Sequence, residues 1–219
     1  MTLFTEYPTP LLPPEPERSA DRQPAHRAHN PKARHRTLDL MRWGLIPHWA
    51  KDIKIGFSTI NAMAETVDSK PVFRKAFQRR RCLVPIKAFY EWKKLGPKEK
   101  QPYAIALGDR GLMPLAGLWE IWRSPAQETV RSFTIITTTP NELCAEVHNR
   151  MPVILPTEAW SEWLAEEPAE EAMLKRMLAP YPAERMTMWP VDKRVGNVKN
   201  NDPSLMSRLW LPETSLKPP

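Results

Sequence analysis

The pattern of apolar and polar residues between positions 38 and 139 predicts a series of short strands. Four segments are rich in β-branched and aromatic residues, and they read LDLMRWGLI (38–46), QPYAIAL (101–107), PLAGLWEIW (114–122) and SFTIITTT (132–139). In the second segment, period-two spacing places Tyr103, Ile105 and Leu107 on one face. The segments are too irregularly spaced for a series of βαβ units.

From residue 139 onward the pattern becomes helical. Thr139 stands at a helix N-cap, Pro140 at the first helical position and Glu142 where a capping box needs it, so we expect a helix that runs to about His148. Two further helices are predicted, at TEAWSEWLAEE (157–167) and AEEAMLKRMLA (169–179). The pattern therefore predicts an α+β fold, a single domain with a curved, mainly antiparallel, barrel-like β-sheet core and peripheral helices.

Residues 1–36 differ in composition from the rest of the chain. They hold seven prolines, three of the five histidines and no glycine, and they show neither helical nor alternating periodicity. We expect a mobile arm over residues 1–36, a folded domain over 37–212 and a short tail over 213–219.

The charge of the chain indicates a polyanionic partner. Thirty-two Lys and Arg against 25 Asp and Glu give a formal net charge of +7 in 219 residues, and the excess is densest in FRKAFQRRR (73–81). A basic surface favours nucleic acid, although such a run is also typical of a solvated helix end. No apolar run is long enough for a membrane helix and no secretory signal is visible, so we expect a monomer in the cytoplasm.

The composition gives no support to a metal or cofactor site. Two cysteines, Cys82 and Cys144, make neither a disulfide framework nor a zinc site, and outside residues 1–36 the only histidines are His48 and His148. A glycine-rich phosphate loop is absent. We expect no cofactor.

Three polar residues stand in surroundings that suit chemistry. Glu91 lies between Tyr90 and Trp92 at the end of an apolar run, where it is either a solvent-facing strand residue or a general acid or base with a raised pKa. Asn61 either caps a helix or orients a reacting group with its amide. His148, at the end of the predicted helix, is either a cap or a functional imidazole.

A cysteine–histidine pair offers a different hypothesis. Cys144 and His148 are four residues apart, which places them on one face of a helix and would suit a nucleophilic hydrolase. A cysteine on an amphipathic helix is more often buried, and its surroundings in ELCAEV contain no activating group except the histidine.

An ordered series of segments resembles the SOS response-associated peptidase (SRAP) family of abasic-site processing proteins. The segments, which span roughly Leu38 to Leu211, are MRWGLIPHWAKD, INAMAETV, KPVFRKAF, RRRCLVPIKAFYEWKK, PYAIAL, LAGLWEIW, FTIITTTPNEL, VHNRMPVIL and NVKNNDPSL. The order of the whole series makes the resemblance specific, since no single segment would suffice.

This resemblance implies a covalent reaction with abasic sites in single-stranded DNA. In the family an N-terminal cysteine condenses with the sugar aldehyde into a thiazolidine, and the same cysteine releases itself from a precursor. By resemblance, Asn61 would position the N-terminal residue, Glu91 would move protons and His148 would assist ring opening. Trp49, Arg74 and Arg81 are the expected DNA contacts, and the nucleoid is the expected location of the bound protein.

The chain also departs from the family pattern. It begins MTLFTEYP where the family begins Met-Cys-Gly-Arg, and Met63 replaces a common arginine. A mobile arm would hold the Thr2 amine at no fixed distance from Asn61. The resemblance therefore implies a crosslinking enzyme with autopeptidase activity. The missing cysteine makes a catalytically impaired single-stranded DNA-binding relative the alternative. The Cys144–His148 hydrolase is the third hypothesis.

Overall fold

Two β-sheets form the framework of the protein. The computed structural model describes residues 2–4, 25–30, 35–166 and 169–210. The smaller sheet has the order β1 (Thr2–Phe4), β7 (Ala88–Lys94), β8 (Lys100–Leu107), β12 (Met186–Pro190). The larger sheet has the order β11 (Met151–Pro152), β10 (Thr129–Thr138), β9 (Met113–Arg123), β6 (Arg81–Ile86), β2 (Ala25–Asn30), β3 (His35–Leu40). Two further short strands, β4 (Arg42–Trp43) and β5 (Asn61–Met63), lie outside this order and pair with β10.

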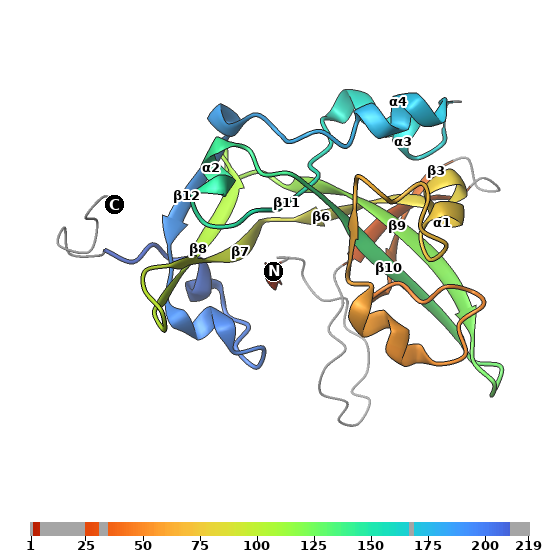
Figure 1. The fold of residues 1–219 in the computed structure, drawn as a ribbon, viewed down its shortest axis with the longest axis horizontal. Helices are drawn as coiled ribbons and strands as arrows, with labels where there is room; N and C mark the ends of the chain where they lie inside the picture. The colour runs from red at the N-terminus through yellow and green to blue at the C-terminus, as the bar shows by residue number, and fades with distance from the viewer. Residues whose placement is uncertain (1, 5–24, 31–34, 167–168, 211–219) are drawn as a thin grey trace.

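Pairing within both sheets is antiparallel except where β4 and β5 run parallel to β10. This confirms the predicted α+β fold on a mainly antiparallel sheet. The expected barrel-like closure is wrong, because the strands divide between two open sheets. The strands β6 and β7 are separated by Lys87 alone, so one stretch of chain passes from the larger sheet to the smaller, as Figure 1 shows.

Short helices cover the sheets and fill the connections. The α-helices are α1 (Arg74–Arg79), α2 (Glu142–Ala145), α3 (Trp160–Trp163) and α4 (Glu171–Arg176), and the 3-10 helices are η1 (Ile53–Ser58), η2 (Thr157–Ala159), η3 (Ala183–Arg185), η4 (Lys193–Gly196) and η5 (Pro203–Met206). Figure 1 places α1, α3 and α4 together at one end of the molecule. Among the described residues, no helix has the length and apolar character needed to cross a bilayer.

Two groups of buried apolar side chains form the core. The first includes Phe89, Ile105 and Trp189 from the smaller sheet, and the second packs Phe77 of α1 against Trp163 of α3 with their rings 6.2 Å apart. Side chains of the larger sheet contribute to both groups. The first group therefore packs the two sheets together, and the second packs the larger sheet against the helices.

The predicted strands and helices differ from the observed ones in two instructive places. Strand β8 buries both faces rather than the single face of Tyr103, Ile105 and Leu107, because Ala104 and Ala106 are also fully covered. The helix expected from Thr139 begins later: Asn141 is its N-cap, accepting a hydrogen bond from the Cys144 amide at 2.9 Å, and α2 ends at Ala145 rather than His148.

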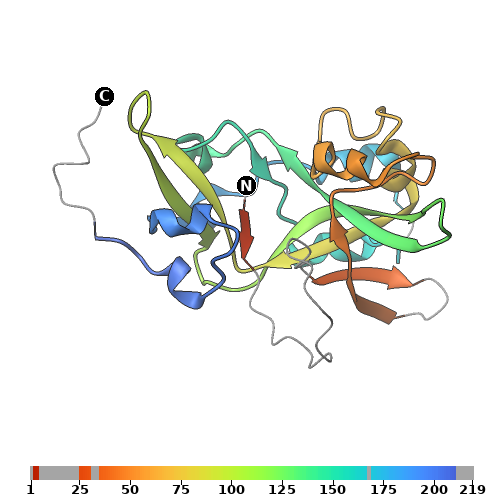
Figure 2. The same cartoon turned by 90° about the horizontal axis from the view of Figure 1, so that it is seen from below.

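The first 36 residues contain strands that the sequence pattern does not predict. Strand β1 pairs with β7, strand β2 pairs with β6, and β3 begins at His35. Figure 2 shows β1 near the middle of the molecule, beside the smaller sheet. The remainder of the expected arm and the whole of the expected tail lie outside the described residues, so the proposed boundaries at 36 and 212 remain predictions.

Candidate functional site

A pocket of about 230 Å³ opens where β5, β7, β10 and the chain after α2 come together. Its lining consists of Asn61, Glu91, Thr137, His148, Arg150, Met151 and Pro152. The three residues expected to carry chemistry, Asn61, Glu91 and His148, are thus brought into one pocket from positions far apart in the chain.

Asn61 lies in a strand and does not cap a helix. Strand β5 runs parallel to β10, with Asn61 opposite Ile135 and the adjacent Ala62 fully buried on the other face. The Asn61 Oδ1 atom is buried and accepts no hydrogen bond within the described part of the chain. Leaving such an acceptor unpaired costs about 1–3 kcal/mol, so a bound group that donates a hydrogen bond would be favoured here.

Glu91 is buried, which excludes its interpretation as a solvent-facing residue. It occupies β7 opposite Tyr103 and exposes 7 % of its surface, although it lines the pocket. Burial raises the pKa of the Glu91 carboxyl above its ordinary value, while the positive charge available on His148 opposes this increase. A carboxyl whose pKa is shifted toward neutrality is suited to give and take protons in the pocket.

His148 lies beyond the end of α2, in the turn that leads to β11. Its backbone N–H donates to the Cys144 carbonyl at 2.9 Å, which continues the last turn of the helix. The exposed imidazole places Nδ1 3.1 Å from the backbone nitrogen and 3.1 Å from the backbone oxygen of Arg150. No hydrogen bond of Nε2 with another described residue is formed, so this nitrogen is available to a bound molecule.

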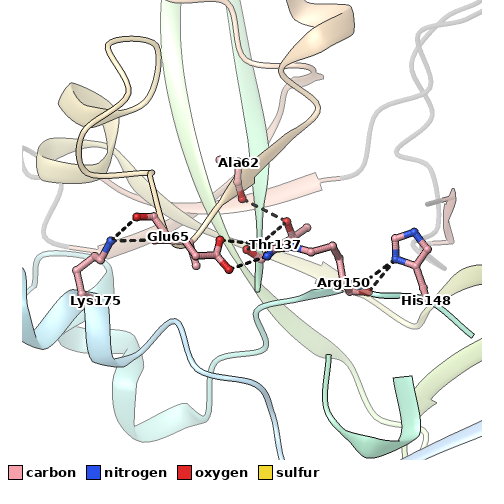
Figure 3. A network of polar contacts seen from close by, with 7 residues as sticks. Ala62, Glu65, Thr137, His148, Arg150 and Lys175 are labelled. Carbon is pink, nitrogen blue, oxygen red and sulfur yellow. Dashed lines mark hydrogen bonds and ion pairs between the residues drawn. The ribbon is translucent and has the colours of Figure 1, made fainter. Parts of the chain in front are cut away.

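An arginine–glutamate pair at the pocket is not apparent from the sequence. Arg150 donates to both carboxylate oxygens of Glu65, at 2.6 and 2.9 Å, and to the Thr137 carbonyl at 2.6 Å (Figure 3). This pairing holds the pKa of Glu65 below its usual value. Nothing in the sequence connects residues that are 85 positions apart, so only the fold reveals the pair.

Cys144 is unsuited to nucleophilic catalysis. The side chain exposes 1 % of its surface, and burial, with the nearby charge of Glu91, raises the pKa of the thiol to about 12. The thiolate, which is the nucleophilic form, is therefore scarce at neutral pH. The structure argues against the Cys144–His148 hydrolase and instead assigns Cys144 to the core.

The basic run divides into exposed and internal residues. Arg74, Lys75 and Arg79 are exposed on α1, whereas Arg80 pairs with the buried Glu120 at 2.7 Å. Arg81 exposes 6 % of its surface and donates to backbone carbonyls at both ends of its guanidinium. The expectation that Arg81 contacts DNA is therefore corrected: its donors are used to join α1 to α3.

Replacement of Arg81 by methionine is expected to destabilise the fold by about 3 kcal/mol, because the buried carbonyls of Phe77 and Trp163 would lose their donor. Urea unfolding followed by tryptophan fluorescence measures the change. The matched control is Arg79→Met, an exposed position on the same α1, which should change stability by less than about 0.5 kcal/mol. Equal effects of the two substitutions would contradict the structural role of Arg81.

The other two expected DNA contacts are on the surface. Trp49 exposes 53 % of its surface in the loop before η1, and Arg74 is exposed at the start of α1. At the base of the loop that carries Trp49, the backbones of Gly44 and Gly56 lie against each other. Gly44 has a φ of +105°, and a side chain there would collide with the Gly56 carbonyl, so only glycine fits. Base stacking by Trp49 and phosphate pairing by Arg74 stay predictions.

Comparisons with known proteins agree in one family. The profile of the SOS response associated peptidase (SRAP) family matches residues 15–198. The abasic site processing protein YoqW of Bacillus subtilis is 47 % identical over 169 residues, which are 77 % of this chain and 75 % of that protein. The abasic site processing protein HMCES of Xenopus tropicalis is 34 % identical over 202 residues, 80 % of this chain and 58 % of that protein. A crystal structure of a Bacteroides thetaiotaomicron protein superposes with a TM-score of 0.73 at 31 % identity, covering 79 % of this chain and 77 % of that one.

Proposed function

The chain belongs to the SOS response associated peptidase (SRAP) family, and on this premise we propose that it binds single-stranded DNA and processes abasic sites in it. The observation that carries the proposal is the pocket in which Asn61, Glu91 and His148 meet. The relatives named above are abasic site processing proteins, which gives the substrate class. We further propose a monomer that acts in the cytoplasm and associates with the nucleoid when bound to DNA.

Each of the three pocket residues has a step that suits its chemistry. The ring-opened abasic sugar presents an aldehyde, which a primary amine attacks to form a carbinolamine and then, with loss of water, an imine. The unpaired Asn61 Oδ1 accepts a hydrogen bond from the attacking amine, and Glu91 protonates the departing hydroxyl. His148 exchanges a proton with the sugar through Nε2 during ring opening.

The position of β1 supports an amine from the start of the chain. Thr2 lies opposite Tyr90 in the antiparallel register of β1 and β7, and Tyr90 is the residue that precedes Glu91 in β7. The Thr2 backbone is therefore tied to the strand that carries the proposed acid, in contrast to the mobile arm expected from the sequence. An oriented amine reacts faster than a diffusing one, which favours imine formation.

The unaltered chain is expected to give a borohydride-dependent crosslink with an abasic oligonucleotide and no heat-stable crosslink without reductant. After removal of Met1, the Thr2 amine, with a pKa of about 8 for an α-amino group, forms an imine. The threonine hydroxyl is a poor nucleophile at neutral pH and does not close a stable ring. Denaturing electrophoresis with abasic and intact single strands measures both species. A strong heat-stable band without reductant would contradict the assignment.

Arg74→Ala is expected to weaken binding to single-stranded DNA by about 1 kcal/mol whatever the base sequence, because a phosphate loses a charged donor. The dependence of log affinity on log salt should become shallower by about 0.7. Fluorescence anisotropy at several salt concentrations measures both quantities. The matched control is Arg185→Ala, an exposed arginine at η3, which lies just before β12 at the other end of the molecule from α1 in Figure 1, and it should bind like the unaltered chain.

A binding protein without crosslinking activity is the second candidate. One observation favours it: Met63, with 44 % of its surface exposed, stands where the family resemblance implies an arginine. This candidate predicts the same salt-dependent DNA binding but no borohydride-trapped species. The electrophoresis experiment therefore separates the two.

A further inference from the structure

The backbone of Arg150 offers the His148 ring a partner in every protonation state. Nδ1 is 3.1 Å from the Arg150 amide nitrogen and 3.1 Å from the Arg150 carbonyl oxygen. An unprotonated Nδ1 accepts from the amide, and a protonated Nδ1 donates to the carbonyl. The imidazole therefore does not have to turn when it gains or loses a proton. When Nδ1 keeps its proton and donates it to the Arg150 carbonyl, Nε2 is the nitrogen that takes up and releases a proton.

The guanidinium of the same residue fixes this stretch of backbone. It donates two hydrogen bonds to the Glu65 carboxylate and a third to the Thr137 carbonyl. The Thr137 carbonyl also accepts a hydrogen bond from the Ala64 amide at 2.8 Å. These bonds close a ring that connects the end of β5, strand β10 and the turn that carries His148 (Figure 3). Because β5 carries Asn61, the ring also relates the two sides of the pocket.

The backbone at Ala64 and Glu65 is held from a second side by Lys175. Lys175 of α4 donates to the Ala64 carbonyl at 2.9 Å and pairs with Asp68 at 2.9 Å. Hydrogen bonding to Arg150 and to Lys175 lowers the pKa of Glu65 and of Asp68 respectively, so both carboxylates stay ionised at neutral pH. The anchor for Arg150 is therefore part of a connected network and does not depend on one flexible side chain.

We propose that Arg150 is a positioning residue for His148. The bonds of the Arg150 guanidinium to Glu65 and Thr137 fix the Arg150 backbone, which holds Nδ1 of His148, so that Nε2 faces the pocket and can bond a bound molecule. The inference rests on the proposed function for its catalytic consequence, because an ordered Nε2 matters only if His148 exchanges a proton with the substrate. Glu65 bonds to Arg150 and not to His148, so a change at Glu65 acts on the ring only through Arg150.

The kinetic test uses Glu65→Ala and Arg150→Lys, each combined with Thr2→Cys. Lysine keeps the positive charge but lacks the planar, forked donors with which Arg150 bonds both Glu65 oxygens and the Thr137 carbonyl. We expect the rate of adduct formation at saturating abasic DNA to fall at least tenfold in both variants, with the DNA affinity of Glu65→Ala within twofold of the parent. Glu166→Ala is the matched control, since it removes a similar two-bond pair, with Arg36, away from the pocket, and it should leave the rate within twofold.

A spectroscopic test decides the positioning without any reaction. Nitrogen-15 spectra of histidine-labelled protein, with His148 assigned through His148→Gln, report the hydrogen bonding of Nδ1. In Glu65→Ala the Nδ1 signal is expected to move toward that of a free imidazole, while Glu166→Ala leaves it in place. An unchanged Nδ1 signal in Glu65→Ala, or an unchanged rate at saturating DNA, would overturn the proposal. A Thr2→Cys protein that forms no adduct would instead refute the proposed function, and the spectra would still decide the role of Arg150.

Discussion

Replacement of Thr2 by cysteine is expected to raise the yield of heat-stable adduct with abasic single-stranded DNA by about 100-fold or more, because a thiol can close the ring that a hydroxyl cannot. The α-amine of the introduced cysteine would form the same imine as threonine, and its thiolate would then add to the imine carbon to close a five-membered thiazolidine. A thiol has a few per cent of its nucleophilic form at neutral pH, whereas a hydroxyl has essentially none. The pairing of β1 with β7 provides the orientation that this second step needs.

Denaturing electrophoresis without reductant measures this gain. A matched variant, Thr5→Cys, places the same thiol in the chain without a free α-amine, and it should form no more heat-stable adduct than the parent. Adduct formation by both variants would show that a thiol alone is sufficient. Absence of adduct in Thr2→Cys would show that β1 does not bring the start of the chain to the pocket.

In the Thr2→Cys background, Glu91→Gln is expected to slow adduct formation by about 10²- to 10⁴-fold, the usual contribution of a general acid or base. Glutamine keeps the size of the side chain and removes its proton chemistry. His148→Gln should have an effect in the same range if sugar opening limits the rate. Single-turnover kinetics at saturating DNA measure the change apart from binding.

The control for this substitution is Glu142→Gln, which changes an exposed glutamate on α2. Its rate should lie within twofold of the parent. The buried carboxyl at position 91 has a raised pKa, so in the parent the rate should also depend on pH through that titration, and in Glu91→Gln this dependence should disappear. A Glu91→Gln variant that reacts at the parental rate would exclude the assigned role.

Strands such as β8 and β9 are predictable from local pattern because their segments are rich in β-branched and aromatic residues. The stretch 114–122, for example, appears within β9, and 101–107 appears within β8. Strands β1 and β2 are not predictable in this way, because their place depends on backbone pairing with β7 and β6 rather than on apolar periodicity. The predicted and observed N-caps of α2 differ because both Thr139 and Asn141 are good N-caps and tertiary packing selects the second.

In the candidate site, too, features that depend on neighbouring residues in the sequence are predictable, and contacts between distant parts of the chain are not. Glu91 is recognisable as a candidate from its aromatic neighbours, but they also allow a solvent-facing position, and only the fold shows that it is buried. The prediction for Arg81 is wrong because five basic residues in one run have the same composition whether they face solvent or the core, and only the fold shows that Arg81 donates to Trp163. The pairing of Glu65 with Arg150 depends on two loops meeting over β10, which no local pattern encodes.

The residue that carries the trapped sugar decides whether this pocket processes abasic sites. The unaltered chain would be reduced with borohydride on an abasic single strand, digested with nuclease and trypsin, and analysed by tandem mass spectrometry. We expect the sugar remnant on the α-amine of Thr2, in the peptide that spans residues 2–18, and a sharply reduced amount of it in Glu91→Gln. A remnant on lysine side chains away from the pocket, or equal labelling in Glu91→Gln, would contradict the claim that this pocket processes abasic sites.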